Sequence, residues 1–120
     1  MGLIFERERR IQDAESEYRQ AVNCDPNDRQ AHFNFGRILV NEKKYKEAIE
    51  QLSQTISPDD ESAPAYLYAL GAAYGRAGDR SHALLYLREA REKASARGQE
   101  ELLVNIENDL HSVEGQTPKN

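Results

Sequence analysis

The residue types that could act as nucleophiles or proton carriers are scattered along this chain of 120 residues. One cysteine, Cys24, and three histidines, His32, His82 and His111, fall in separate segments. Ser81 and His82 are adjacent, but neighbouring residues on a helix point about 100° apart and do not pair as nucleophile and base. We therefore expect no catalytic residues, and we interpret the histidines as partly exposed helix residues.

Metal and cofactor sites are not indicated either. The sequence contains no CxxC, HxxxH or HExxH spacing and no Walker-type or GxGxxG loop. The acidic run Asp59-Asp60-Glu61 is more typical of a solvated loop than of a cation site. We expect neither a metal ion nor a cofactor.

The charge of the chain argues against nucleic acid as a partner. A formal net charge of −5 disfavours contact with phosphates. Of the two basic clusters, one is interleaved with glutamates and the other is typical of a solvated turn between helices (Arg7, Arg9 and Arg10; Lys43, Lys44 and Lys46).

Composition also limits the compartment. The chain has 31% charged residues and no long apolar run, which predicts no membrane span. The charges from Glu6 to Arg10 interrupt any signal-peptide pattern. We expect the chain to form one domain. A single cysteine excludes a disulfide within the chain, so we expect this domain in the reducing cytoplasm.

One segment, residues 70–90, indicates which kind of secondary structure the chain forms. It has the pattern of two short amphipathic helices joined by a turn at Gly78-Asp79. Gly71 inside the first helix costs up to about 1 kcal/mol relative to Ala, so we expect it to admit Ala83 of the second helix at close range. Ala83, Leu87 and Ala90 form the apolar stripe of that second helix.

The same pattern occurs twice more upstream, at intervals of 35 and 34 residues. A hairpin this small cannot cover its own apolar surface, so the period predicts a solenoid of stacked helix pairs. The matched positions of the three copies are Gly2, Phe5, Ala14, Tyr18 and Ala21; Gly36, Leu39, Ala48, Leu52 and Thr55; and Gly71, Tyr74, Ala83, Leu87 and Ala90.

These copies resemble tetratricopeptide repeats, whose pattern of 34 residues has Leu-Gly, an aromatic residue, then Ala, a second aromatic residue and Pro. The resemblance extends to about Ala96. Departures are the absence of Trp, Thr55 at a small apolar position, and one extra residue within 57–62. The pattern is carried by Leu70-Gly71 with Tyr74, Phe35-Gly36 with Leu39, Ala83 with Leu87, Ala48 with Leu52, and Asp25-Pro26-Asn27-Asp28.

The resemblance implies an all-α fold, a right-handed α-α superhelix (solenoid) of antiparallel helix pairs. We expect about two and a half to three repeats plus a C-terminal capping helix. The expected segments are a truncated first repeat at 1–28, a second repeat at 29–62, a third at 63–97, the capping helix at 98–114 and a disordered tail at 115–120.

Within these segments we expect helices at about 11–24, 29–41, 45–56, 63–76, 80–96 and 99–113. Asn27 or Asp28 should cap the second of them, and Ser62 the fourth, which has Pro64 in its first turn. In the capping helix, Glu107 stands where earlier copies have Gly. Its stripe is Leu103, Ile106, Leu110 and Val113, and its polar outer face is Glu100, Glu107, Asn108 and Asp109.

Leu3, Ile4 and Phe5 match the end of a helix whose beginning precedes Met1. Either the chain is part of a longer array, or its first repeat is natively half a repeat. Because the preceding turn is missing, we expect fraying or a dimer contact at these residues.

In tetratricopeptide arrays the first helix of each pair lines a concave groove that binds extended peptides or partner helices. Two rows of an aromatic residue followed by arginine suggest apolar contact at one edge and carboxylate recognition at the other. The alternative is an exposed helix face with snorkelling arginines. The groove residues implied are Gln30, Phe33, Asn34, Arg37 and Asn41, with Tyr68, Ala69, Ala72 and Arg76.

One subclass of the family does not fit. Members that grip the acidic C-terminus of chaperones use a two-carboxylate clamp of Lys, Asn, Asn, Lys and Arg. Asn34 falls at one clamp position, but Leu3, Ala65 and Ala69 occupy others. We do not expect this clamp here.

Two functions of different class follow from the sequence. The first is a non-enzymatic module that binds a peptide or helical segment of a partner protein in the groove, as scaffold or adaptor. The alternative is a self-association module, a homodimer or larger assembly that stacks through Leu3, Ile4 and Phe5.

Overall fold

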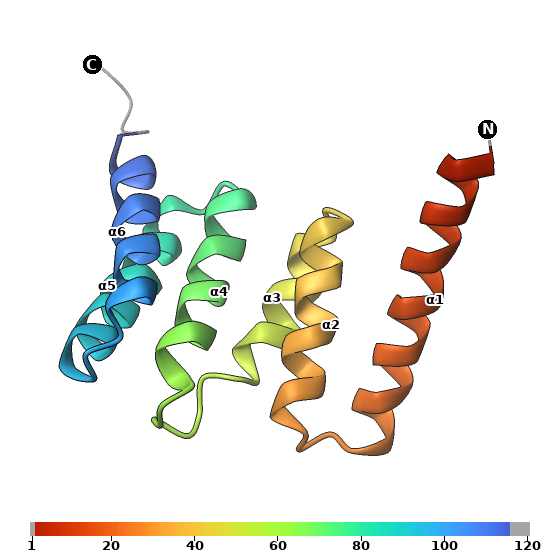
Figure 1. Cartoon of the computed structure of the whole chain (residues 1–120), viewed down its shortest axis with the longest axis horizontal. Coiled ribbons are helices and arrows are strands. Elements are labelled where there is room, and N and C mark those ends of the chain that lie inside the picture. The colour runs from red at the N-terminus through yellow and green to blue at the C-terminus, as the bar shows by residue number, and fades with distance from the viewer. Residues whose placement is uncertain (1, 116–120) are drawn as a thin grey trace. The chain divides into compact units, whose positions relative to one another are not determined.

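A computed structural model describes residues 2–115, with side chains from Glu8 onward, and these residues form six helices (Figure 1). The described part contains no strand, so the predicted all-α fold is confirmed. The side chains of Leu3, Ile4 and Phe5 and the tail from Gln116 lie outside the described residues. The helices are α1 (Gly2–Cys24), α2 (Arg29–Asn41), α3 (Tyr45–Ser53), α4 (Ala63–Arg76), α5 (Arg80–Ala96) and α6 (Glu100–Glu114).

The helices divide into two compact units, α1–α3 in residues 1–54 and α4–α6 in residues 55–120. In the first unit, α1 packs on α2, which forms a hairpin with α3. In the second, α4 and α5 form the hairpin and α6 packs on both. The repeat boundaries given above stay a prediction.

The expected break in the first helix is wrong. We expected one helix to end near Phe5 and another to begin near Ile11, but α1 runs without interruption over 23 residues. The five residues between them are only glutamate and arginine, which favour helix, and they include neither Gly nor Pro to make a turn.

The other helix bounds follow the expectations closely. α2, α4 and α5 begin and end at the expected residues, and α6 is displaced by one residue. α3 ends at Ser53 instead of Ile56. The Ser53 hydroxyl donates a hydrogen bond of 2.6 Å to the carbonyl of Ile49, and such a bond competes with continuation of the helix.

Local capping explains where these helices begin. Asp28 is the N-cap of α2, and its carboxylate accepts the Ala31 N–H at 3.2 Å. Asp79 does the same for α5 with the N–H of His82 at 3.1 Å. Ser62 precedes α4 as expected but makes no capping bond with its side chain.

Each unit has its own apolar core. In the first unit, Phe35 and Leu39 of α2 and Ala48 of α3 are buried, with Tyr18 and Val22 of α1 packed against them. In the second, the helices meet around Leu67, Leu84, Leu87, Ile106, Leu110 and Val113. No helix in the described part of the chain combines the length and apolar character needed to cross a membrane.

The glycine at the α4–α5 contact has a different neighbour from the one expected. A Cβ atom at Gly71 would lie 2.9 Å from Leu87 Cγ, whereas Ala83 lies opposite Gly75. The close approach was predicted correctly, but its partner was not, because helix crossing decides which side chain meets the glycine.

Candidate partner-binding faces on α2 and α4

The face of α2 predicted to bind a partner lies opposite the core of the first unit. Gln30, Arg37 and Asn41 are exposed, and Phe33 and Asn34 are half-buried. The Arg37 guanidinium carbon lies 5.6 Å from the centre of the Phe33 ring, a cation–π arrangement. Snorkelling of Arg37 over Phe33 therefore holds the guanidinium at the surface of this helix.

Two amides on the same face are also paired. Gln30 Nε2 donates a hydrogen bond of 3.2 Å to Asn34 Oδ1. The five predicted residues of α2 thus form a surface with one apolar ring, three amides and one cation. Such a surface offers both apolar contact and hydrogen bonds to an approaching chain.

On α4, the predicted residues Tyr68, Ala72 and Arg76 line one hollow of about 420 Å³ in the second unit. Gly75, Leu87 and Val113 form its apolar part, and Asp109 and Ser112 of α6 complete it. The predicted Ala69 is half-buried on α4 and is not part of this hollow.

The position of Asp109 corrects the sequence analysis. We expected Asp109 on the outer polar face of the last helix, where Glu100, Glu107 and Asn108 are indeed exposed. Instead Asp109 is half-buried and its carboxylate lies beside Tyr68. Burial, and then the negative charge of Asp109, raise the pKa of Tyr68 to about 12, so the hydroxyl stays protonated.

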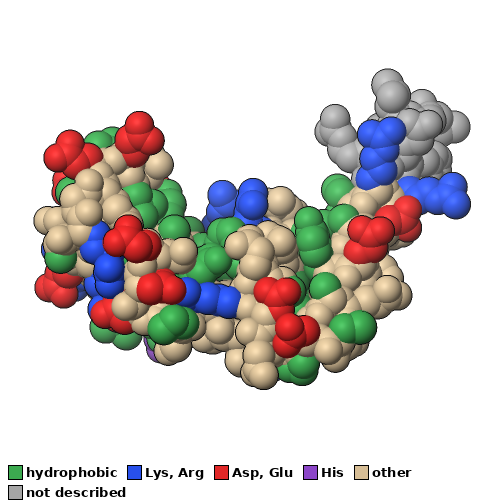
Figure 2. All heavy atoms as spheres, turned by 60° about the horizontal axis from the view of Figure 1, so that its bottom comes forward, with side chains coloured by type: hydrophobic (Ala, Val, Ile, Leu, Met, Phe, Trp, Pro, Cys, Tyr) green, Lys and Arg blue, Asp and Glu red, His purple; other side chains and the backbone are tan. Residues whose placement is uncertain are grey.

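Arg76 has no hydrogen bond or ion pair to any residue that the structure describes, and its side chain is exposed. Several other cations of this unit are paired: Lys93 with Asp59 at 2.7 Å, Arg97 with Asp59 at 3.2 Å and Arg88 with Glu114 at 3.3 Å. Acidic and basic side chains alternate over this unit, on the left in Figure 2. Arg76 is therefore a cation available to a ligand.

The sequence predicted one groove made from both helices. Because α2 and α4 belong to different units, each face is a candidate surface by itself. The place of Asp109 in the hollow could not be predicted, because its spacing on α6 does not show which side of that helix meets α4.

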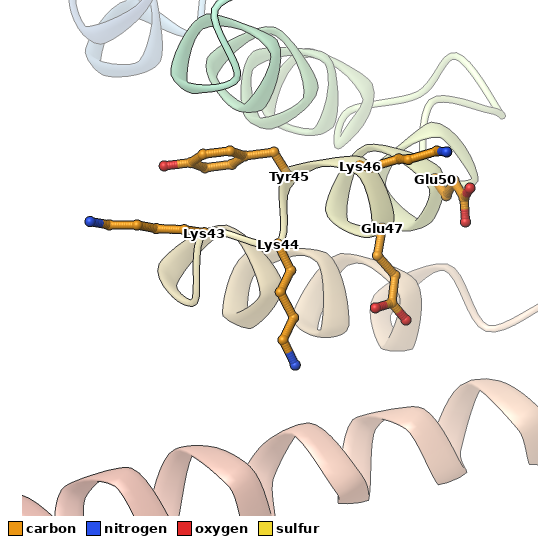
Figure 3. A pocket seen from close by; sticks show the side chains of 6 residues that line it. All are labelled: Lys43, Lys44, Tyr45, Lys46, Glu47 and Glu50. Carbon is orange, nitrogen blue, oxygen red and sulfur yellow. The ribbon is translucent and has the colours of Figure 1, made fainter.

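The lysine turn between α2 and α3 borders a second hollow, of about 540 Å³ (Figure 3). Lys44 and Glu47 point toward α1, and Lys43 and Tyr45 extend in another direction. Lys44 Nζ donates to both carboxylate oxygens of Glu15 on α1, at 3.0 and 3.2 Å. Lys43, Lys44 and Lys46 are exposed, as expected of a solvated turn, and Lys44 also ties α1 to the hairpin.

Further charges surround this contact. Arg19 bridges Glu15 at 3.2 Å and Glu47 at 2.9 Å. Glu42 lies beside Glu15, and its buried Oε2 atom lies 3.9 Å from Lys44 Nζ and has no hydrogen-bond partner among the described residues. Burial and the neighbouring Glu15 raise the pKa of Glu42, whereas the hydrogen bonds to Lys44, Glu42 and Arg19 outweigh burial and lower the pKa of Glu15. This cluster is a structural contact between α1 and the turn.

The histidines do not form a catalytic arrangement. His32 is buried, against expectation, and its ring nitrogens lie 2.7 Å from Gln51 Oε1 and 2.6 Å from the carbonyl of Pro26. His82 stacks on Tyr74 and contacts Asp79 at 2.7 Å, and His111 is exposed. Over the described residues, no three His, Cys, Asp or Glu side chains gather as metal ligands.

Comparison with known proteins agrees with the helical repeats. A family model described as tetratricopeptide repeat matches residues 2–104. A search of curated proteins gives no match to the chain. Tetratricopeptide repeats generally mediate interactions between proteins.

Proposed function

Because the chain belongs to the tetratricopeptide repeat family, we propose that it is a non-enzymatic module that binds a peptide or helical segment of a partner protein. The candidate binding surfaces are the predicted face of α2 and the predicted face of α4, each by itself. Its role is that of a scaffold or adaptor in the cytoplasm, without a cofactor.

The observation that supports this proposal most directly is the hollow on α4. Tyr68, Ala72 and Arg76, which the family resemblance assigned to the groove, line it together, and no side chain that the structure describes fills its apolar part. On α2, Phe33 and Arg37 repeat the combination of a ring and a cation. Both faces offer a partner an apolar contact beside a charge.

The experiment is a selection of random twelve-residue peptides displayed on phage, followed by fluorescence anisotropy of the selected peptides as synthetic ligands. Arg37→Ala and Arg76→Ala should each weaken binding about tenfold where a carboxylate contacts the guanidinium. The oligomeric mass should not change. Arg91→Ala, which removes an exposed arginine of α5, is the matched control.

Selection of no peptide above background would overturn the proposal. So would peptides whose affinity is unchanged by substitutions on both α2 and α4, since binding would then lie elsewhere on the chain.

The second candidate is self-association through Leu3, Ile4 and Phe5. One feature favours it: α1 is helical from Gly2, so these three consecutive apolar residues belong to its first turns.

A further inference from the structure

Gly75 is a glycine that the fold does not require. It lies inside α4, where glycine costs helix stability, and its φ is not positive. A Cβ atom there would meet only Ala83 Cβ and Val113 Cγ2, each at 3.8 Å, which is ordinary van der Waals contact. Gly71 and Gly78 differ, because Gly71 is pressed against Leu87 and Gly78 has φ of +88°.

The place where Gly75 leaves room is the apolar part of the α4–α6 hollow. A side chain at this position would project into space bordered by Val113 and Ala83. A glycine at this position leaves the backbone of α4 accessible to close approach by a ligand.

The two charges at the hollow are not equivalent. Asp109 is half-buried and lies beside Tyr68. Arg76 is exposed and has no hydrogen bond or ion pair among the described residues. Arg76 is therefore the exposed charge of the hollow, and its complement on a ligand is a carboxylate.

We propose that the α4–α6 hollow binds an apolar side chain of a partner peptide over Gly75 and Ala72, while an adjacent Asp or Glu of that peptide pairs with Arg76. The inference rests on the proposed function and specifies its ligand. A volume of about 420 Å³ accommodates one large aliphatic or aromatic side chain together with part of the neighbouring residue.

The carboxylate is that of an internal side chain and not a C-terminus. Capture of a C-terminal carboxylate uses either a nest of free backbone N–H groups or the clamp of several side chains described above, which is not expected here. At the hollow, α4 and α6 are continuous helices, whose interior N–H groups are bonded within the helix. Arg76 is thus the donor that the hollow offers to one carboxylate.

The test uses the peptides selected on the whole chain, synthesised with amidated C-termini. We expect them to share an apolar residue within two positions of Asp or Glu. Exchange of that acid for its amide should weaken binding about tenfold, and in the Arg76→Ala protein the same exchange should have almost no further effect. Asp109→Asn should leave affinity unchanged or raise it severalfold, because it removes a negative charge near the bound carboxylate.

Gly75→Ala gives a signature that a purely structural role would not produce. The added methyl group should raise the melting temperature while it weakens peptide binding severalfold. A variant that is both more stable and a poorer binder locates the ligand over this glycine.

The outcomes separate the two proposals. Peptides that bind through α2 but are indifferent to Arg76→Ala and Gly75→Ala would overturn this inference and leave the proposed function standing. Peptides rich in Lys or Arg that lose affinity on Asp109→Asn would also overturn it. Failure to select any peptide would overturn both.

Discussion

Leu87 of α5 lies against the backbone of Gly71 in α4, so that a Cβ atom at Gly71 would come within 2.9 Å of Leu87 Cγ and 3.1 Å of the Leu87 amide nitrogen. The first unit repeats this contact, with a Cβ atom at Gly36 only 2.6 Å from Leu52 Cγ. The equivalence of the two pairs shows that the same helix crossing is built twice.

Substitution of Gly71 therefore tests the helix crossing. Because a backbone atom lies in the way, Gly71→Ala must push the helices apart, and we expect a loss of about 1–3 kcal/mol in the free energy of unfolding. The measurement is urea denaturation followed by circular dichroism. Gly75→Ala is the control and should gain up to about 1 kcal/mol. Equal stability of both variants would show that the crossing is looser than the distances indicate.

Lys43 adopts a left-handed backbone conformation, with φ of 64°, in the turn between α2 and α3. The equivalent position 35 residues later is Gly78. A side chain in this region costs roughly 1 kcal/mol, so Lys43→Gly should raise the stability of the chain by about that amount. Thermal unfolding provides the measurement.

Lys43→Ala separates backbone strain from loss of the lysine side chain, since alanine keeps the Cβ atom. We expect this variant to be close to wild type. A gain as large as that of Lys43→Gly would attribute the effect to the lysine charge instead.

Tyr68 should titrate at a higher pH than a tyrosine of an unfolded chain. Its pKa is raised to about 12 by burial and by Asp109, compared with about 10 in an unfolded chain. The resulting contribution to stability is complete below pH 10 and is lost as the pH rises through 12. The difference in phenolate absorbance between wild type and Tyr68→Phe should therefore appear near pH 12, and Asp109→Asn should move it toward 10. A midpoint near 10 in the wild type would contradict the Tyr68–Asp109 contact.

Substitution of Glu42 and substitution of Glu15 should change the stability of the chain in opposite directions. Neutralising Glu42 relieves its repulsion with Glu15, so Glu42→Gln should stabilise the chain by about 0.5 kcal/mol at pH 7. Glu15→Gln removes the partner of Lys44 and Arg19 and should destabilise it by about 1 kcal/mol.

The pH dependence follows from the two shifts. The contribution of Glu15, whose pKa is lowered, is present above its unfolded value of about 4.3 and is lost as the pH falls through the folded value. The contribution to stability of Glu42, whose pKa is raised, is complete below about pH 4.3 and is lost as the pH rises through the pKa of the folded state. Melting temperatures between pH 3 and 8 measure both, and identical profiles for the two variants would refute the assignment.

Light scattering over a tenfold or wider concentration range decides between the two candidate functions. With peptide binding as the main function, we expect a monomer of 13.7 kDa at every concentration, for the wild type and for Phe5→Asp alike. A dimer that dissociates on Phe5→Asp would instead make the first turns of α1 an interface.

Local chemistry was sufficient to predict most of the helices. Asp28 and Asp79 cap α2 and α5 by bonding to backbone N–H groups three residues later, and Gly78 follows α4 with a positive φ. The ends of these helices are therefore encoded within a few residues. The repeated pattern that includes Gly36 and Gly71 was likewise sufficient to predict the family and the all-α fold. The break expected after Phe5 was transferred from the later copies, although the local residues favour helix.

What local chemistry could not supply was the set of partners that each side chain meets. Asp109 and Glu107 are both polar residues of α6, yet Asp109 is half-buried beside Tyr68 and Glu107 faces water. Lys44 and Lys43 are adjacent, yet only Lys44 reaches Glu15. Spacing along a helix sets which residues share a face, but the crossing angle between helices decides what that face touches, and this depends on the packing of the whole unit.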